Sequence, residues 1–184
     1  MTASRIMVIR HGEKPRLDGA VLGVNESGAA DANELSVRGW QRAGALVRFF
    51  APVGTTTPPQ GIGRPDVLFA QGLGQQVTSV RAQHTLTPLA QLLGLPISTQ
   101  FRKGEERALA AAATSSTGTV LIAWEHKAIC ELANILMGNV QSTPQTWPDE
   151  RFDIVWVFNA DGAGWQFHQV PELVLPGDAV MPIA

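Results

Sequence analysis

Segments typical of buried β-strands alternate with segments typical of amphipathic helices along most of this chain. Residues 5–10 are the clearest strand, because residues 6–9 are four consecutive large apolar residues. The clearest helix follows Ser36, a favourable N-cap residue, and carries a stripe of apolar residues on one face. The stripe consists of Val37, Trp40, Ala43, Leu46, Val47 and Phe50. This alternation predicts an α/β fold with a mostly parallel central sheet and helices on both faces.

The rest of the chain continues this pattern. Pro88 lies inside a helical segment at 78–93, so we expect a kink or a break there, with Thr87 as a new cap. The last two strands should form a hairpin around residues 160–162 and add antiparallel strands at one edge. The expected architecture is a three-layer α/β/α arrangement in one domain spanning residues 1–184. Further strands are expected at 66–70, 95–99, 119–124, 153–159 and 164–169, and further helices at 104–114 and 127–137.

Charge and cysteine content limit the classes of function. The net charge is −2 and there is no basic run, so we expect neither a nucleic-acid partner nor a membrane surface. No apolar run approaches membrane-spanning length, and the first residues lead into a strand without a signal peptide. Cys130 is the one cysteine, which predicts a reducing, cytoplasmic location and a small buried side chain. The four histidines form no metal-binding motif, so no metal or cofactor is expected; the oligomeric state stays open.

Three predicted strand ends carry the residues that bear chemistry. The first strand ends at Arg10, His11 follows it directly, and Gly12 then allows a turn. Arg81 lies near the start of the helix after the second strand, and His126 follows the strand at 119–124. Because the carboxyl ends of parallel strands meet at one edge of a sheet, two arginines and two histidines should converge there.

Such a cluster suits phosphoryl transfer. Two guanidinium groups bind phosphate oxygens bidentately and offset the charge of the transition state. Their positive field disfavours imidazolium and keeps His11 neutral and nucleophilic. A backbone carbonyl that accepts from Nδ1–H of His11 leaves Nε2 to attack phosphorus, while His126 donates to a phosphoryl oxygen. A carboxylic acid is also needed, to protonate the leaving alkoxide and then to activate water.

Four stretches carrying these residues resemble the histidine phosphatase superfamily, which has the phosphoglycerate mutase-like fold. The resemblance implies a phosphohistidine intermediate on His11, with Arg10, Arg81 and His126 forming the phosphate pocket. The four stretches are Arg10-His11-Gly12-Glu13, Leu35-Ser36-Val37-Arg38-Gly39-Trp40-Gln41-Arg42-Ala43, Ser79-Val80-Arg81-Ala82-Gln83-His84-Thr85 and Val120-Leu121-Ile122-Ala123-Trp124-Glu125-His126.

The general acid is less clearly marked. In the mutase-like branch it is a glutamate after the second arginine, a place that maps to Glu105 or Glu106. In the acid phosphatase-like branch an aspartate follows the second histidine, where this chain has Lys127. Glu125 precedes His126, and strand alternation predicts that its side chain points to the other face. We therefore expect Glu105 or Glu106, ahead of Glu125, to be the acid.

Four other side chains have structural interpretations. Glu13 is expected to orient the turn or to contact substrate, and His84 to support Arg81 from one turn further along its helix. His168 and Cys130 are expected to be structural. The predicted function is hydrolysis of a phosphomonoester, either a small phosphorylated metabolite or a phosphoprotein. Two alternatives stay open: a phosphoglycerate-type mutase, and a non-catalytic module that binds phosphate or a phosphopeptide.

Overall fold

A six-stranded sheet forms the centre of the protein. The computed structural model describes residues 2–54, 57–74, 78–162 and 164–184. The strand order is β3-β2-β4-β1-β5-β6; the first four of these are parallel, and β5 and β6 run antiparallel at one edge. The elements are β1 (Ala3–Arg10), α1 (Val37–Phe50), β2 (Val67–Ala70), α2 (Arg81–Leu93), β3 (Ile97–Ser98), α3 (Glu106–Ser115), β4 (Gly118–Trp124), α4 (His126–Met137), β5 (Ile154–Asp161) and β6 (Gly164–Pro171).

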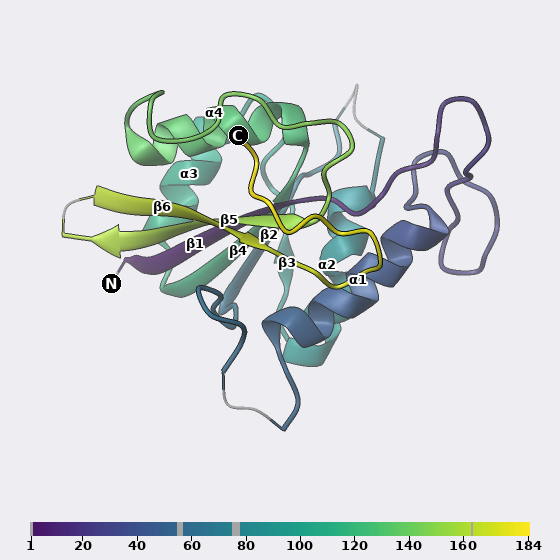
Figure 1. The fold of residues 1–184 in the computed structure, drawn as a ribbon, viewed down its shortest axis with the longest axis horizontal. Coiled ribbons are helices and arrows are strands. Elements are labelled where there is room, and N and C mark those ends of the chain that lie inside the picture. Colours follow the sequence, from purple (N-terminus) through teal and green to yellow (C-terminus); the bar gives the residue numbers. More distant parts are fainter. Residues whose placement is uncertain (1, 55–56, 75–77, 163) are drawn as a thin grey trace.

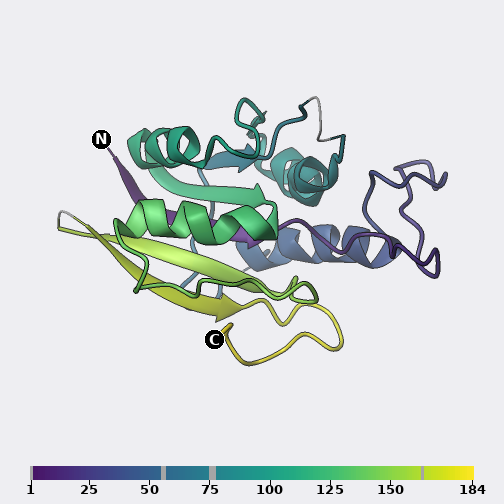
Figure 2. The same ribbon diagram turned by 90° about the horizontal axis from the view of Figure 1, so that it is seen from above.

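Helices cover both faces of the sheet. In Figure 1, α3 and α4 lie above the sheet and α1 and α2 lie below it. Figure 2 shows α3 and α4 side by side over the strands. Each face has its own apolar core, one built with α3 and α4 and the other with α1 and α2. The predicted three-layer fold, with a mostly parallel sheet and an antiparallel edge, is confirmed.

The central position of β1 explains its apolar run. Ile6 and Val8 pack into the core under α3 and α4, whereas Met7 and Ile9 pack into the core under α1 and α2. β4 and β5 pair with the two edges of β1, and the two helix layers cover its two faces. A strand buried on both faces loses the usual alternation of apolar and polar residues.

The helices follow their local signals, with one exception. Ser36 caps α1 by accepting a hydrogen bond from the Gly39 amide, as expected. Of the two alternatives at Pro88, the break is wrong, because α2 continues through it to Leu93, and the kink stays a prediction. Thr87 caps no new helix; its hydroxyl donates to the Gln83 carbonyl one turn earlier. Packing of the apolar face of α2 into the core offsets the backbone hydrogen bond lost at the proline.

The parallel strands all end on the side from which the loop at 14–34 projects, at the right of Figure 1. The loop at 138–153, between α4 and β5, returns to the same side. The residues that follow β1, β2, β3 and β4 therefore meet between these two loops. In the described ranges, no helix is both long and apolar enough to cross a membrane.

Candidate active site

The turn after β1 holds His11 in one orientation. Its Nδ1 lies 2.8 Å from the Gly12 carbonyl, which accepts the ring proton and leaves the Nε2 lone pair unused. The Gly12 amide donates to the Thr85 hydroxyl at 2.8 Å, and that hydroxyl donates to the Arg81 carbonyl at 2.7 Å. A Cβ at position 12 would lie 2.9 Å from the Gly39 carbonyl oxygen, so only glycine fits. The turn is thereby fixed against both α1 and α2.

Arg10 is almost fully buried beneath this turn, with 1% of its surface exposed. Its Nη1 donates to the carbonyls of Pro148, Asp149 and Arg151, and its guanidinium lies 3.7 Å from the centre of the Phe152 ring. Its Nε and Nη2 are buried and have no partner among the described residues. These two nitrogens form one edge of the guanidinium, the edge that binds an oxyanion bidentately.

Arg81 and His126 provide further unpartnered nitrogens. Arg81 is the first residue of α2; its Nη1 donates to the Ala32 carbonyl, and its buried Nε has no partner in the described part of the chain. His126 is the first residue of α4, and its Nε2 lies 2.5 Å from a carboxylate oxygen of Asp149. Its buried Nδ1 likewise has no described partner. Buried nitrogens without partners are rare in folded proteins, and these nitrogens are available to an anionic ligand.

These groups lie around one cavity of about 380 Å³. His11, Arg81, Glu125 and His126 all line it, and Arg10 lies behind His11. The expected convergence of two arginines and two histidines is therefore present in the structure. The first turn of α4 also begins at this cavity, and free amides of a helix N-terminus favour an anion.

The electrostatics keep His11 neutral. Burial, together with the charges of Arg10, Arg81 and His126, lowers its pKa to about 3 in spite of the Gly12 hydrogen bond, which raises it. Burial also lowers the pKa of His126, opposed by its bond to Asp149. Burial lowers the pKa of Arg10 to about 10, which still leaves the guanidinium charged at neutral pH.

The carboxylates differ from the sequence-based expectation. Glu105 is exposed and accepts a hydrogen bond from the Arg102 amide. Glu106 is 1% exposed and accepts from the Trp124 indole and the Gly104 amide, so it is part of the packing under α3. Neither residue lines the cavity, whereas Glu125 does.

The prediction that Glu125 points to the other face of the sheet is wrong. β4 ends at Trp124, and Glu125 is already the N-cap residue of α4, so strand alternation no longer applies to it. Its carboxylate lies 2.7 Å from Nζ of Lys103.

Sequence reasoning missed Asp149 and Lys103. Asp149 lies in the loop between α4 and β5, where its carboxylate bonds to His126 and its carbonyl to Arg10. No sequence motif marks Asp149, because the position of a loop depends on how the elements at its two ends pack. Lys103 follows β3 and lines the cavity, in the stretch where the family pattern favours a glutamate. A signal for Lys103 existed: it lies shortly after a parallel strand, as His11 and His126 do.

Four further residues lie outside the cavity. Glu13 binds Arg38 and Arg42, so it orients the turn. Nδ1 of His84 lies 2.7 Å from a Glu34 carboxylate oxygen, and His168 lies on β6. Cys130 is buried on α4, and burial raises the pKa of its thiol. Among the described residues, no group of three or more histidine, cysteine, aspartate or glutamate side chains is arranged to hold a metal.

Comparison with known proteins shows the fold. No family profile and no curated protein sequence matches this chain. Among solved structures, an alpha-ribazole phosphatase from Shigella flexneri is 14% identical with a TM-score of 0.51, over 98% of this chain and 100% of that chain. A mycobacterial glucosyl-3-phosphoglycerate phosphatase solved with VO3 is 12% identical with a TM-score of 0.53, and the match covers 90% of this chain and 97% of that chain. A protein described as mycobacterial hydrolase 1 is 13% identical with a TM-score of 0.54, and the match covers 94% of this chain and 99% of that chain.

The chain thus has the phosphoglycerate mutase-like α/β fold, as the sequence resemblance implies. The aligned regions span nearly the whole length of both chains in each comparison. Identities this low show the arrangement of the elements, and the chemistry of the site depends on this chain's own residues.

Proposed function

We propose that this protein is a phosphatase of the histidine phosphatase superfamily that hydrolyses a phosphomonoester through a phosphohistidine on Nε2 of His11. The observation that carries the proposal is the buried imidazole fixed through Nδ1 on the Gly12 carbonyl, beside unpartnered nitrogens of Arg10, Arg81 and His126. A neutral nucleophile and a set of unused donors are what an incoming phosphoryl group requires. The phosphatases that share this fold support the same activity.

In the first step the Nε2 lone pair of His11 attacks phosphorus, and the bond from phosphorus to the ester oxygen breaks. The free guanidinium edge of Arg10 and Nε of Arg81 bind the phosphoryl oxygens and offset the charge that builds up on them. The leaving alkoxide takes a proton from Glu125, the one glutamate among the described residues that line the cavity. Glu125 enters this step protonated and therefore without its ion pair to Lys103.

In the second step water attacks phosphorus and the bond to Nε2 breaks, which regenerates neutral His11. Glu125, now a carboxylate, accepts the proton from the attacking water, so each turnover returns the site to its starting state. The Asp149 carboxylate accepts a hydrogen bond from Nε2 of His126 and favours the protonated ring, whose Nδ1–H then donates to a phosphoryl oxygen.

The test compares wild-type protein with His11→Ala in two assays. Wild type is expected to hydrolyse an aryl phosphate and to form an acid-labile, alkali-stable phosphoryl adduct, seen by intact mass. His11→Ala is expected to lose both. His168→Ala is the matched control, because His168 lies on β6 away from the cavity and its loss should leave both readouts unchanged.

The results separate the alternatives. Hydrolysis that survives in His11→Ala would disprove the proposed nucleophile. Binding of phosphate esters without an adduct or release would indicate a binding module, and transfer of the phosphoryl group to a second hydroxyl would indicate a mutase. The substrate classes we include are small phosphorylated metabolites and phosphoproteins. A cytoplasmic location is also part of the proposal, supported by the single, buried cysteine.

A further inference from the structure

The lysines of this chain are all in one place. The sequence contains three lysines, Lys14, Lys103 and Lys127, and all three line the cavity that contains His11. Each follows a parallel strand within a few residues: Lys14 follows β1, Lys103 follows β3 and Lys127 follows β4. Every other basic side chain apart from histidine is an arginine. The cavity therefore holds a group of flexible, compact cations that the rest of the chain lacks.

This positive charge exceeds what one phosphoryl group requires. Arg10, Arg81 and His126 already supply unpartnered nitrogens for the phosphoryl oxygens. Lys103 pairs with Glu125 at 2.7 Å, whereas no ion pair joins Lys14 or Lys127 to a carboxylate of the described residues. The whole chain has a net charge of −2, so the cationic lining runs against the overall balance.

The remaining wall of the cavity is polar. Asn33, Gln71, Thr78 and Ser79 contribute amide and hydroxyl groups, and Ala82 is the one apolar residue among the described lining residues. An aryl or alkyl leaving group would meet only one apolar side chain there. A small polar leaving group with charge of its own would find cations and hydrogen-bonding groups.

We propose that the substrate carries a second anionic group, a carboxylate or another phosphate, next to the phosphoester, and that Lys14, Lys103 and Lys127 bind it. This inference rests on the proposed phosphatase function and names its substrate class. The lysines surround a cavity of about 380 Å³ instead of extending along a surface, which favours a small molecule over a phosphoprotein. A lysine ammonium group binds carboxylate and phosphate alike as a point charge, so both groups belong to the proposed class.

The test compares phosphoesters that differ in one group. The one-anion probe is 2-hydroxyethyl phosphate. The two-anion probes are 2-phosphoglycolate, in which a carboxylate replaces the hydroxymethyl group of the first probe, and the bisphosphate of ethylene glycol. We expect kcat/KM for at least one two-anion probe to exceed that for 2-hydroxyethyl phosphate by about tenfold or more, the scale of one charge-assisted hydrogen bond. If no probe is turned over, their inhibition constants against aryl phosphate hydrolysis give the same comparison.

Variants show whether the lysines cause the preference. Lys14→Gln, Lys103→Gln and Lys127→Gln are each expected to lower the ratio between two-anion and one-anion probes. Arg48→Gln is the control, since it removes one positive charge from the exposed far end of α1 and should leave the ratio unchanged. The readout is the ratio of kcat/KM for a two-anion probe to kcat/KM for the one-anion probe. A loss of folding or of general activity lowers both values and leaves this ratio unchanged.

Each outcome has one meaning. Equal kcat/KM or equal inhibition for all probes overturns the second anionic group and leaves the phosphatase function in place. A preference that survives in all three lysine variants overturns the assignment to these residues. Absence of any aryl phosphate hydrolysis overturns the proposed function, and this inference with it.

Discussion

At the scale of single residues, the four histidines of this chain differ mainly in what their ring nitrogens contact. His11 and His126 line the cavity, His84 binds Glu34, and His168 lies on β6. Only His11 combines deep burial, a carbonyl on Nδ1 and two guanidinium groups nearby. The local setting, and not the residue type, makes His11 the candidate nucleophile.

The lowered pKa of His11 predicts a pH-dependent stability. Its pKa is about 3 in the folded protein and near its ordinary 6.5 in the unfolded chain, so between these values the unfolded state binds more protons. This contribution to the free energy of unfolding is therefore lost as the pH falls below about 6.5. From about pH 7 to about pH 4.5 the loss due to His11 should be on the order of 2 kcal/mol.

Urea unfolding of wild type and His11→Asn at both pH values measures this effect. The variant should lose less stability on acidification than wild type, because asparagine does not titrate. Parallel losses in the two proteins would show that His11 does not have a depressed pKa. His168→Asn provides the comparison for a histidine outside the cavity.

The assignment of the acid to Glu125 predicts a dependence on the leaving group. Glu125→Gln keeps the shape of the side chain but has no proton to give to an alkoxide. Hydrolysis of an alkyl phosphate should fall about 100-fold or more, the usual contribution of a general acid. Hydrolysis of a nitrophenyl phosphate should fall much less, because that leaving group departs without a proton. Steady-state kcat/KM for the two esters gives the measurement.

Glu105→Gln and Glu106→Gln are the controls for this series. Glu105 is exposed and Glu106 is buried against Trp124, and neither lines the cavity. Both variants should keep the alkyl-to-aryl ratio of wild type. A loss of alkyl phosphate hydrolysis in either of them, with Glu125→Gln unaffected, would return the role to the residues that the sequence favours.

At the scale of elements, the sequence predicts those helix and strand bounds that local interactions determine. The bounds of α1 follow from Ser36 and the apolar stripe, and β1 follows from four consecutive apolar residues. The side chains of Arg10 and His11 were placed correctly because they continue a central strand. The local signal at Pro88 does not decide between a kink and a break, and α2 continues because its tertiary packing outweighs that signal.

The parts of the site that come from loops were not predictable in this way. Asp149 reaches His126 only because the segment between α4 and β5 folds back over Arg10. Glu125 faces the cavity only because β4 gives way to α4 at that residue. A change of one or two residues in an element boundary decides such orientations, and boundaries are what a sequence pattern defines least well.

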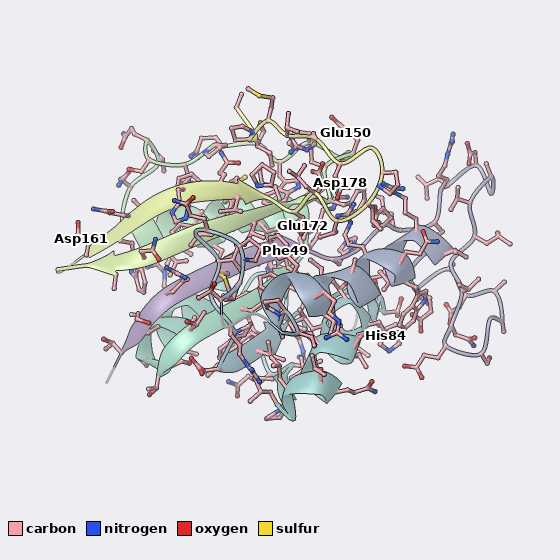
Figure 3. All side chains as sticks on the ribbon, turned by 60° about the horizontal axis from the view of Figure 1, so that its bottom comes forward. Phe49, His84, Glu150, Asp161, Glu172 and Asp178 are labelled. Atoms are coloured by element: carbon pink, nitrogen blue, oxygen red, sulfur yellow. The ribbon has the colours of Figure 1, made fainter. Side chains whose placement is uncertain are left out.

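A buried ionic cluster connects α1 to the C-terminal segment. Arg42, on α1, binds Glu13, which follows the turn at Gly12, and binds Glu172 and Asp178 after β6. Figure 3 labels Glu172 and Asp178 on the C-terminal segment near α1. Burial raises the pKa of Glu172 to about 8, against the effect of Arg42. Bonds to Asp178 and Glu13 raise the pKa of Arg42 even though burial would lower it.

This cluster predicts a large effect of Arg42→Met. The substitution leaves three carboxyl groups close together and removes the one buried cation that they share. Loss of one partner of a buried charge cluster costs about 3–5 kcal/mol, and urea unfolding should show a decrease of that size. Arg48→Met, on the exposed face of the same helix, should change stability by no more than about 0.5 kcal/mol. Equal effects of the two substitutions would mean that the cluster adds no stability.

At the scale of the whole molecule, charge is distributed unevenly. The chain has more acidic than basic residues, yet three lysines and two arginines lie in or behind one cavity. Three of the acidic residues belong to the cluster around Arg42. The fold thereby separates anionic groups that hold the structure together from cationic groups that face the cavity. An anionic substrate should be drawn to the cavity over a distance set by the salt concentration.

This separation predicts that kcat/KM falls as salt rises. Between about 0.01 M and about 0.15 M salt the Debye length shortens from about 30 Å to about 8 Å, which removes most of the long-range attraction. For a two-anion phosphoester we expect a decrease of about tenfold in kcat/KM, and a smaller decrease for 2-hydroxyethyl phosphate. Stopped assays across a salt series, with sodium chloride as the salt, give both slopes.

Lys14→Gln should weaken the dependence of kcat/KM on salt concentration for the two-anion ester, while Arg48→Gln should leave that dependence unchanged. The free energy of unfolding, measured in the same series, shows whether salt acts on the fold instead. If kcat/KM were independent of salt while both esters were hydrolysed, the cationic lining would act only in direct contact with bound substrate, with no role in drawing it in.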